Sequence, residues 1–310
     1  MMKYTTLGKT GIEVSTITFG CWELGNDGKW TFTSDDNNIA ALRQAFDRGV
    51  TTFDSAEGYG NGHSETVVGK ALSGIRTQCV IASKVSPSHL HAGDVRRSVE
   101  TSLKNLGTDY LDIYYIHWPN TEVPLAETLG EFDKLKAEGL IRAIGVSNFS
   151  LEQLEAAVKL TRIDILQLEY SLLKRDPETS GILPFCIAHD IGFTSYSSLA
   201  KGILTGAYHL GKAKVSPADF RAERRLFLPE HLEKETELVQ LMKVLADRQG
   251  VSISQVALAW LLSRPGLTTA IVGTQNAKHL DDNLAAAGVV LPADMLDQLD
   301  AMSTKVLAGL

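Results

Sequence analysis

Cysteine is scarce in this chain, and its few cysteines are scattered. Cys21, Cys79 and Cys186 are the only three in 310 residues, and no two of them form a C-x-x-C pair. Isolated cysteines of this kind are typical of reduced thiols in a reducing compartment. A chain of about 300 residues buries roughly three quarters of its unfolded surface, so a hydrophobic core can stabilise it without disulfides.

Long apolar runs and basic clusters are also missing. No stretch of about 18 apolar residues occurs, which excludes a membrane-spanning helix. Residues 1–6 lack the apolar segment of a signal peptide. The formal net charge of −7 disfavours nucleic acid and anionic lipid as partners, and the histidines show no metal-ligand spacing. We therefore expect a cytoplasmic enzyme that binds a small molecule and no metal. The sequence does not indicate an oligomeric state.

What the chain does contain is a regular alternation of short β-branched runs with amphipathic stretches. This pattern predicts an α/β fold, a (β/α)8 TIM barrel that forms a single domain over residues 1–310. A β-hairpin made of residues 4–7 and 12–14 precedes the alternation and is expected to close the barrel floor. The eight predicted barrel strands are residues 16–20, 51–54, 80–85, 111–117, 141–147, 165–169, 192–197 and 269–272.

Capping residues indicate where several helices begin and end. Ser34 precedes apolar residues at helical spacing, and Ser150 with Gln153 three residues later has the pattern of a capping box. Gly139 follows another helical run and is expected to end it in the left-handed region. Residues 200–230 fit no element and predict a long irregular loop of the kind that covers or binds a ligand.

Polar residues stand at the ends of consecutive predicted strands, where the active site of such a barrel lies. Strand two ends at Asp54, strand three at Lys84 and strand four at His117. Tyr59 follows Asp54 by five residues in a glycine-flanked loop, which suits a close approach to a ligand. A carboxylate, an ammonium, an imidazole and a phenol are therefore expected at one mouth of the barrel.

These four groups suit one kind of chemistry. A free tyrosine has a pKa of about 10, too high for efficient proton exchange at neutral pH, and a neighbouring ammonium from Lys84 is expected to lower the pKa of Tyr59. Asp54 supplies the counter-charge of Lys84, and a neutral His117 can orient a carbonyl oxygen. The set predicts the acid–base half of a hydride transfer.

Each of these residues also has a structural interpretation when it is taken alone. An aspartate at a strand end commonly caps a turn, and a tyrosine commonly packs in a core or at its rim. A lysine at a buried strand end is rarer unless it is paired. The occurrence of all four on consecutive strands in this order favours catalysis.

The motifs around these residues resemble the aldo-keto reductase family, in particular the bacterial branch related to potassium-channel β subunits. The resemblance extends from about residue 3 to residue 305 and implies an NAD(P)-dependent oxidoreductase. The segments that carry it are residues 53–60 with 64, 65 and 69, then 81–84, 113–119, 144–149, 167–170 and 196–206.

By resemblance, the catalytic residues are Asp54, Tyr59, Lys84 and His117. Trp22, Tyr59, His117 and Trp118 are implied to contact the substrate. The implied cofactor-binding residues are Gly20, Cys21, Trp22, Asp54, Ser147, Asn148, Gln167, Tyr196, Ser197, Ser198, Leu199, Lys201, Gly202, Gly273, Thr274, Gln275, His279, Asp282 and Asn283. By the same resemblance, Ser147, Asn148 and Gln167 are expected to hold the nicotinamide carboxamide, Tyr196 to stack on the ring, and residues 197–206 to cover the pyrophosphate.

One segment departs from the family pattern. After strand eight the family carries lysine or arginine that binds the 2′-phosphate of NADPH, whereas Gln275, Asn276 and His279 stand at these positions here. A lost charge-assisted contact weakens binding by about 1.5–3 kcal/mol. NAD(H) is therefore expected to serve at least as well as NADP(H), unless Lys278 or a basic residue such as Lys212 reaches the phosphate.

The substrate and the direction of the reaction are left open by the sequence. The first reading is a reductase acting on an aldehyde, a ketone or a sugar. An NAD-linked sugar or polyol dehydrogenase is the second reading, favoured by the weak 2′-phosphate site. A regulatory subunit that senses the nicotinamide redox state is a third, and the intact set of four polar residues weighs against it.

Overall fold

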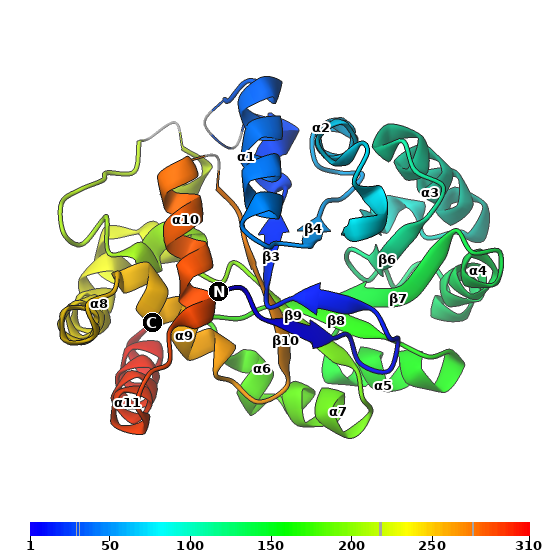
Figure 1. Ribbon diagram of the computed structural model, residues 1–310. Helices are drawn as coiled ribbons and strands as arrows, with labels where there is room; N and C mark the ends of the chain where they lie inside the picture. Colours follow the sequence, from blue (N-terminus) through cyan, green and yellow to red (C-terminus); the bar gives the residue numbers. More distant parts are fainter. Residues whose placement is uncertain (29, 31, 217–218, 275) are drawn as a thin grey trace.

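The computed structural model describes residues 1–28, 30, 32–216, 219–274 and 276–310, and eight parallel strands form a closed barrel at its centre (Figure 1). Each strand pairs with its neighbours along the chain, and the last strand closes the barrel by pairing with the first. The barrel strands are β3 (Ile17–Gly20), β4 (Thr52–Asp54), β5 (Val80–Val85), β6 (Leu111–Ile116), β7 (Ile141–Ser147), β8 (Ile165–Glu169), β9 (Gly192–Tyr196) and β10 (Leu267–Val272). The predicted (β/α)8 barrel is confirmed.

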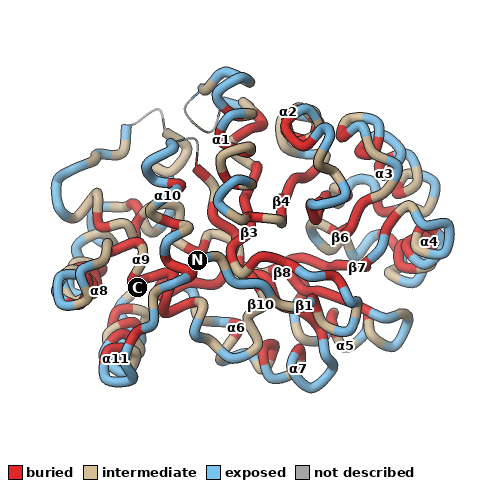
Figure 2. The backbone as a smooth tube through the Cα atoms, viewed as in Figure 1, coloured by how far each residue is buried: buried red, intermediate tan, exposed pale blue. Residues whose placement is uncertain are grey.

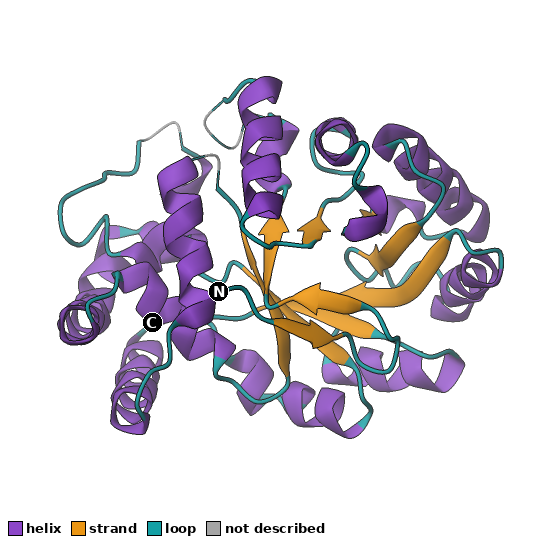
Figure 3. Cartoon of the chain, viewed as in Figure 1, coloured by secondary structure: helices purple, strands orange, loops and turns teal. Residues whose placement is uncertain are grey.

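Helices surround the strands on the outside of the barrel (Figure 3). The α-helices are α1 (Asp35–Asp47), α2 (His63–Leu72), α3 (Ala92–Leu106), α4 (Leu125–Ala137), α5 (Leu151–Leu160), α6 (Asp176–Thr179), α7 (Ile182–Ala188), α8 (Pro229–Gln249), α9 (Ile253–Leu262), α10 (Ala277–Ala285) and α11 (Ala293–Gly309). Short 3-10 helices are η1 (Trp22–Gly25), η2 (Arg76–Gln78), η3 (Pro87–His89), η4 (Ala200–Thr205), η5 (Phe220–Glu223), η6 (Arg225–Phe227) and η7 (Ala286–Gly288).

The helix caps follow the sequence. The Ser34 hydroxyl accepts a hydrogen bond from the first turn of α1, and Ser150 and Gln153 form a reciprocal capping box at the start of α5. Gly139 follows the end of α4 with φ of +80°, a conformation that glycine adopts without a Cβ clash. These three capping predictions are confirmed.

The N-terminal hairpin consists of β1 (Tyr4–Thr6) and β2 (Glu13–Ser15), paired antiparallel. Leu7, Ile12 and Val14 are buried and pack with side chains from the barrel interior, among them Val80 and Ile113. Val80 is the first residue of β5, and Ile113 lies in the first half of β6. The hairpin therefore covers the end of the barrel opposite to the strands' carboxyl ends, as predicted.

Burial is concentrated in the barrel and on the inner faces of the helices (Figure 2). Every residue of β5 and of β6 is buried, as is usual for parallel strands covered by helices. Among the described helices, none is long and apolar enough to cross a membrane.

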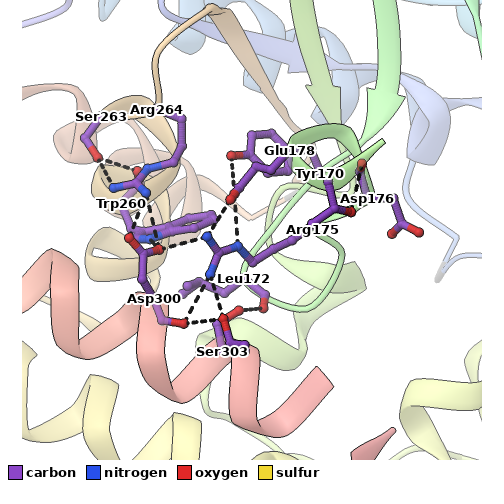
Figure 4. A network of polar contacts seen from close by, with 12 residues as sticks. Tyr170, Leu172, Arg175, Asp176, Glu178, Trp260, Ser263, Arg264, Asp300 and Ser303 are labelled. Atoms are coloured by element: carbon purple, nitrogen blue, oxygen red, sulfur yellow. Dashed lines mark hydrogen bonds and ion pairs between the residues drawn. The ribbon is translucent and has the colours of Figure 1, made fainter. Parts of the chain in front are cut away.

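A polar network fixes the C-terminal helix α11 against α9 (Figure 4). Asp300 of α11 accepts hydrogen bonds from the Trp260 indole at 2.9 Å and from the Arg264 guanidinium at 3.0 Å. Arg175, in the segment between β8 and α6, pairs with Asp300 at 3.2 Å and also with Glu178. One carboxylate thus joins three parts of the chain on the outside of the barrel.

The segment predicted as an irregular loop over residues 200–230 contains η4, η5 and η6, and α8 already begins at Pro229. We call residues 206–216 and 219–228 the strap. The strap runs beside α8 and α10 (Figure 1) and contributes side chains to the cavity described next. The backbone before it is bent sharply, with Ser197, Ala200 and Lys201 all at positive φ.

Candidate active site

A cavity of about 1270 Å³ opens at the carboxyl ends of the barrel strands. Its volume exceeds the roughly 300–1,000 Å³ of a typical small-ligand site, which leaves room for an extended ligand together with a small one. Among the described residues, no group of three or more His, Cys, Asp or Glu side chains is arranged to hold a metal ion.

Almost all of the residues predicted for the site line this cavity. Lys84 does not line it, and Gln275 lies outside the described residues. The predicted residues that line the cavity are Gly20, Cys21, Trp22, Asp54, Tyr59, His117, Trp118, Ser147, Asn148, Gln167, Tyr196, Ser197, Ser198, Leu199, Lys201, Gly202, Gly273, Thr274, His279, Asp282 and Asn283.

Lys84 lies beneath the cavity floor and connects the polar groups there. Its ammonium is fully buried and donates hydrogen bonds to Asp54 Oδ1 at 2.5 Å, to the Ser55 carbonyl at 2.7 Å and to the Tyr59 hydroxyl at 3.3 Å. The adjacent strands β4 and β5 place these residues side by side, with Asp54 opposite Ala82. The Tyr59 phenol is therefore backed by a positive charge that is itself neutralised by a carboxylate.

The electrostatics of this cluster differ in one respect from the sequence expectation. Burial raises the pKa of Tyr59 above its ordinary value; Lys84 opposes this shift, and Asp54 adds to it. Lys84 thus lowers the pKa of Tyr59, as expected, but desolvation of the phenolate outweighs the attraction of the ammonium, so the net shift of this pKa is upward. The pKa of Lys84 is itself raised, since Asp54 and Tyr59 more than offset its burial.

His117 faces Tyr59 across the cavity. The two rings lie 5.7 Å apart in an edge-to-face arrangement. Burial, helped by the charge of Lys84, lowers the pKa of His117 to about 3. The imidazole is therefore neutral at physiological pH and keeps one N–H donor and one acceptor nitrogen.

A close approach of two backbone segments positions Tyr59. A Cβ on Gly60 would lie 2.0 Å from the carbonyl oxygen of Gly25, so only glycine lets the tyrosine loop pack against η1. The start of α2 is held nearby, because the Ser64 hydroxyl donates to the Cys21 carbonyl at 2.8 Å. These contacts connect the loops after β3 and β4.

A second group of polar side chains lies at the ends of β7, β8 and β9. Gln167 donates from Nε2 to Asp54 Oδ2 at 2.9 Å, and Asn148 donates to the His117 carbonyl at 2.9 Å. The Tyr196 hydroxyl donates to Asn148 Oδ1 at 2.8 Å. The predicted carboxamide site and the predicted catalytic residues therefore belong to one hydrogen-bond network.

Beyond Tyr196, aromatic residues of the strap meet those of the loop after β3. The Phe220 ring lies 5.5 Å from Trp22 and 4.9 Å from Trp30, both edge to face. Arg221 extends over the bend before the strap, where its guanidinium donates to the Lys201 carbonyl at 3.3 Å. The strap is thereby joined across the cavity to the opposite loop.

The end of the cavity near α10 carries the segment that departs from the family pattern. Asn276 Oδ1 accepts hydrogen bonds from the backbone N–H groups of Lys278 and His279, so this side chain caps the helix. His279 lines the cavity, whereas Lys278 does not. Asp282 is held by Ser252 and Gln255.

Several cavity residues escaped sequence reasoning. Lys243 and Asp247 of α8 line the cavity and form an ion pair, with the i, i+4 spacing that is common for surface pairs on helices. Glu23 also lines the cavity, and burial raises the pKa of this carboxyl to about 7, against the opposing effect of Arg221. No sequence pattern connects α8 with the strand ends. The strap separates α8 from β9 along the chain, and only the folded path of the strap brings the helix to the cavity.

Comparisons with known proteins agree with this architecture. The model of the aldo/keto reductase family matches residues 16–304. The aldo-keto reductase YhdN of Bacillus subtilis (strain 168) is 35% identical, covering 96% of this chain and 92% of the relative. The NADH-specific methylglyoxal reductase of Escherichia coli (strain K12) is 32% identical, with coverages of 94% and 95%. A probable voltage-gated potassium channel subunit beta of Arabidopsis thaliana is also 32% identical, with coverages of 96% and 96%.

Solved structures resemble the chain over almost its whole length. The aldo/keto reductase of Klebsiella pneumoniae in complex with NADP and acetate has a TM-score of 0.78 and 32% identity, covering 97% of this chain and 95% of that one. The glycerol dehydrogenase of Gluconobacter oxydans has a TM-score of 0.88 and 27% identity, with coverages of 96% and 94%.

Proposed function

The chain belongs to the aldo/keto reductase family, and from this premise we propose that it is an NAD(P)-dependent oxidoreductase that interconverts a carbonyl compound and its alcohol. The observation that carries the proposal is the contact of the Tyr59 hydroxyl with the Lys84 ammonium at 3.3 Å, at the floor of the large cavity. We also propose that residues 1–310 form one barrel domain.

The cavity residues fit a nicotinamide nucleotide. Ser147, Asn148 and Gln167 carry hydroxyl and amide groups that match a carboxamide, and Tyr196 offers an aromatic ring in the same part of the cavity. When bound, the nicotinamide ring supplies or accepts the hydride. The relatives support both forms of the nucleotide: one structure contains NADP, and one relative is named as NADH-specific.

Tyr59 acts as the general acid in reduction and as the general base in oxidation. Because burial raises its pKa, the phenol is protonated at neutral pH and holds a proton for the carbonyl oxygen. Lys84 stabilises the phenolate left after the proton has moved, and Asp54 keeps the ammonium charged. Neutral His117 donates a hydrogen bond that orients the same oxygen.

We propose that NAD(H) is used at least as well as NADP(H). Asn276 is engaged as a helix cap, Lys278 does not line the cavity, and His279 has no permanent charge. An NAD-linked sugar or polyol dehydrogenase is the second candidate, supported by this weak 2′-phosphate site and by the similarity to a glycerol dehydrogenase.

A rate assay tests both parts of the proposal. NADH and NADPH are each measured with one simple aldehyde, and NAD and NADP with a panel of aldoses and polyols. Turnover in the first set supports the reductase, and turnover confined to the second supports the dehydrogenase. Binding of nucleotide without turnover of any substrate would instead support a sensing subunit.

A further inference from the structure

An ion pair on α8 forms part of the lining of the cavity. Lys243 and Asp247 lie one helical turn apart and form an ion pair, and both line the cavity. Ser252, five residues after Asp247 at the start of α9, also lines the cavity and donates a hydrogen bond to Asp282 of α10 at 2.8 Å. The C-terminal part of α8 is thus connected through Ser252 to α10, the helix that begins in the segment departing from the family pattern.

The wall made by α10 offers no permanent positive charge among its described residues. The Asn276 side chain is used in capping, and the Asp282 carboxylate is directed to Ser252 and Gln255. His279 is the only basic side chain of α10 that lines the cavity in the described part of the chain. A cation for a phosphate group at this end must therefore come from elsewhere.

The part of the cavity lining contributed by α8 has such a cation, but this cation is already neutralised. The Lys243 ammonium is bound by the Asp247 carboxylate, and both side chains are about half exposed, at 44% and 64%. A phosphate group approaching Lys243 meets the carboxylate of Asp247 at the same place, and like charges at close range repel. A hydroxyl group approaching the same carboxylate can donate a hydrogen bond to it.

We propose that the Asp247–Lys243 pair of α8 determines which adenosine nucleotide the site accepts, with Asp247 selecting a free 2′-hydroxyl over a 2′-phosphate. The proposal rests on the nucleotide-binding function proposed above. It assigns the discrimination to α8 and not to α10. Removing the carboxylate frees the ammonium and converts the same wall into a phosphate site.

The test uses nucleotide fragments, so that its readout does not depend on hydride transfer. Dissociation constants of 5′-AMP, 2′,5′-ADP, NADH and NADPH are measured by calorimetry at low ionic strength. Asp247→Asn is expected to tighten binding of 2′,5′-ADP and NADPH by about tenfold, since one charge-assisted contact to a phosphate becomes available. Binding of 5′-AMP and NADH should weaken, by up to about tenfold, because the charge-assisted hydrogen bond from the 2′-hydroxyl to the Asp247 carboxylate is lost.

Two further variants identify the source of the gain. Glu237→Gln removes one negative charge from the same helix, from an ion pair with Lys305 that does not line the cavity, so it should leave all four constants unchanged. Asp247→Asn combined with Lys243→Gln should abolish the gain. A gain that persists in this double variant and disappears with Lys212→Gln would assign the cation to the strap and overturn the proposal.

The outcomes separate the two proposals. If the unmodified protein binds NADH but Asp247→Asn and Glu237→Gln behave alike, the specificity role of Asp247 is wrong and the nucleotide function stands. If no variant binds any of the four nucleotides, the proposed function fails, and the inference with it.

Discussion

The amide of Gln167 donates a hydrogen bond to the carboxylate of Asp54 at 2.9 Å, across the interior of the barrel from β8 to β4. The other carboxylate oxygen of Asp54 accepts from Lys84. A residue of the proposed carboxamide site and the charge pair behind the proposed acid therefore share one buried carboxylate. Changes at either place are expected to affect both nucleotide binding and proton transfer.

Tyr59→Phe is expected to lower turnover by at least ~10²-fold, the scale of general acid–base catalysis. The variant keeps the ring and its packing, so it should fold and bind nucleotide as the unmodified protein does. Turnover numbers and nucleotide dissociation constants measured side by side check this. Near-native turnover would remove Tyr59 from the mechanism.

Lys84→Met is expected to abolish most activity, because it removes the cation that stabilises the Tyr59 phenolate. Asp54→Asn should reduce activity less at neutral pH, since the ammonium is still present. Without its carboxylate the pKa of Lys84 falls, so activity of Asp54→Asn should decline at a lower pH than activity of the unmodified enzyme. An unchanged pH–rate profile in both variants would show that this pair does not tune the tyrosine.

His117 is expected to make the protein less stable in acid. Its pKa is about 3 in the folded state and about 6.5 when unfolded, so between these values only the unfolded chain takes up the proton. Stability therefore falls as pH decreases through this window, by at most about 1.4 kcal/mol per pH unit. Urea unfolding between pH 7 and pH 4.5 should show a steeper loss for the unmodified protein than for His117→Gln. Parallel curves would mean that His117 titrates normally.

Asn276→Arg is expected to shift selectivity toward NADP(H) by roughly tenfold, through one guanidinium–phosphate contact. The same change removes the cap of α10, which typically costs about 1 kcal/mol of stability. His279→Arg keeps the cap and lines the cavity, so it is the matched variant for the same shift. Fluorescence titration gives the constants. A hundredfold preference of the unmodified enzyme for NADPH would contradict the interpretation and point to Lys212 of the strap.

Asp300→Asn is expected to destabilise the protein by about 1–3 kcal/mol. The change weakens the acceptor for the Trp260 indole and removes the counter-charge of the Arg264 guanidinium, while Arg175 loses one of its two carboxylate partners and keeps Glu178. Asp297→Asn, on an exposed position of the same helix, is the control and should have little effect. Equal melting temperatures for the two variants would show that the network does not hold α11 in place.

Much of the fold was predictable because its signals are local. Ser150 and Gln153 form a capping box over four consecutive residues, and runs such as Val80–Val85 are long enough to identify a buried strand. Asp54, Lys84 and His117 were predicted at the ends of consecutive strands. In a barrel of parallel strands these ends lie on the same side, so the three residues were expected at one mouth of the barrel.

Contiguous residues by themselves determined the strands, the caps and the positions of the catalytic candidates. Only the tertiary structure decided that Asp247 of α8 faces the cavity, that Phe220 meets Trp22, and that the pKa of Tyr59 is raised and not lowered. These properties depend on burial and on contacts between segments up to about two hundred residues apart, which arise only when the barrel closes and the strap crosses it. Burial removes water from every charge at once, so its effect on a pKa is a sum over the surrounding structure that no local pattern contains.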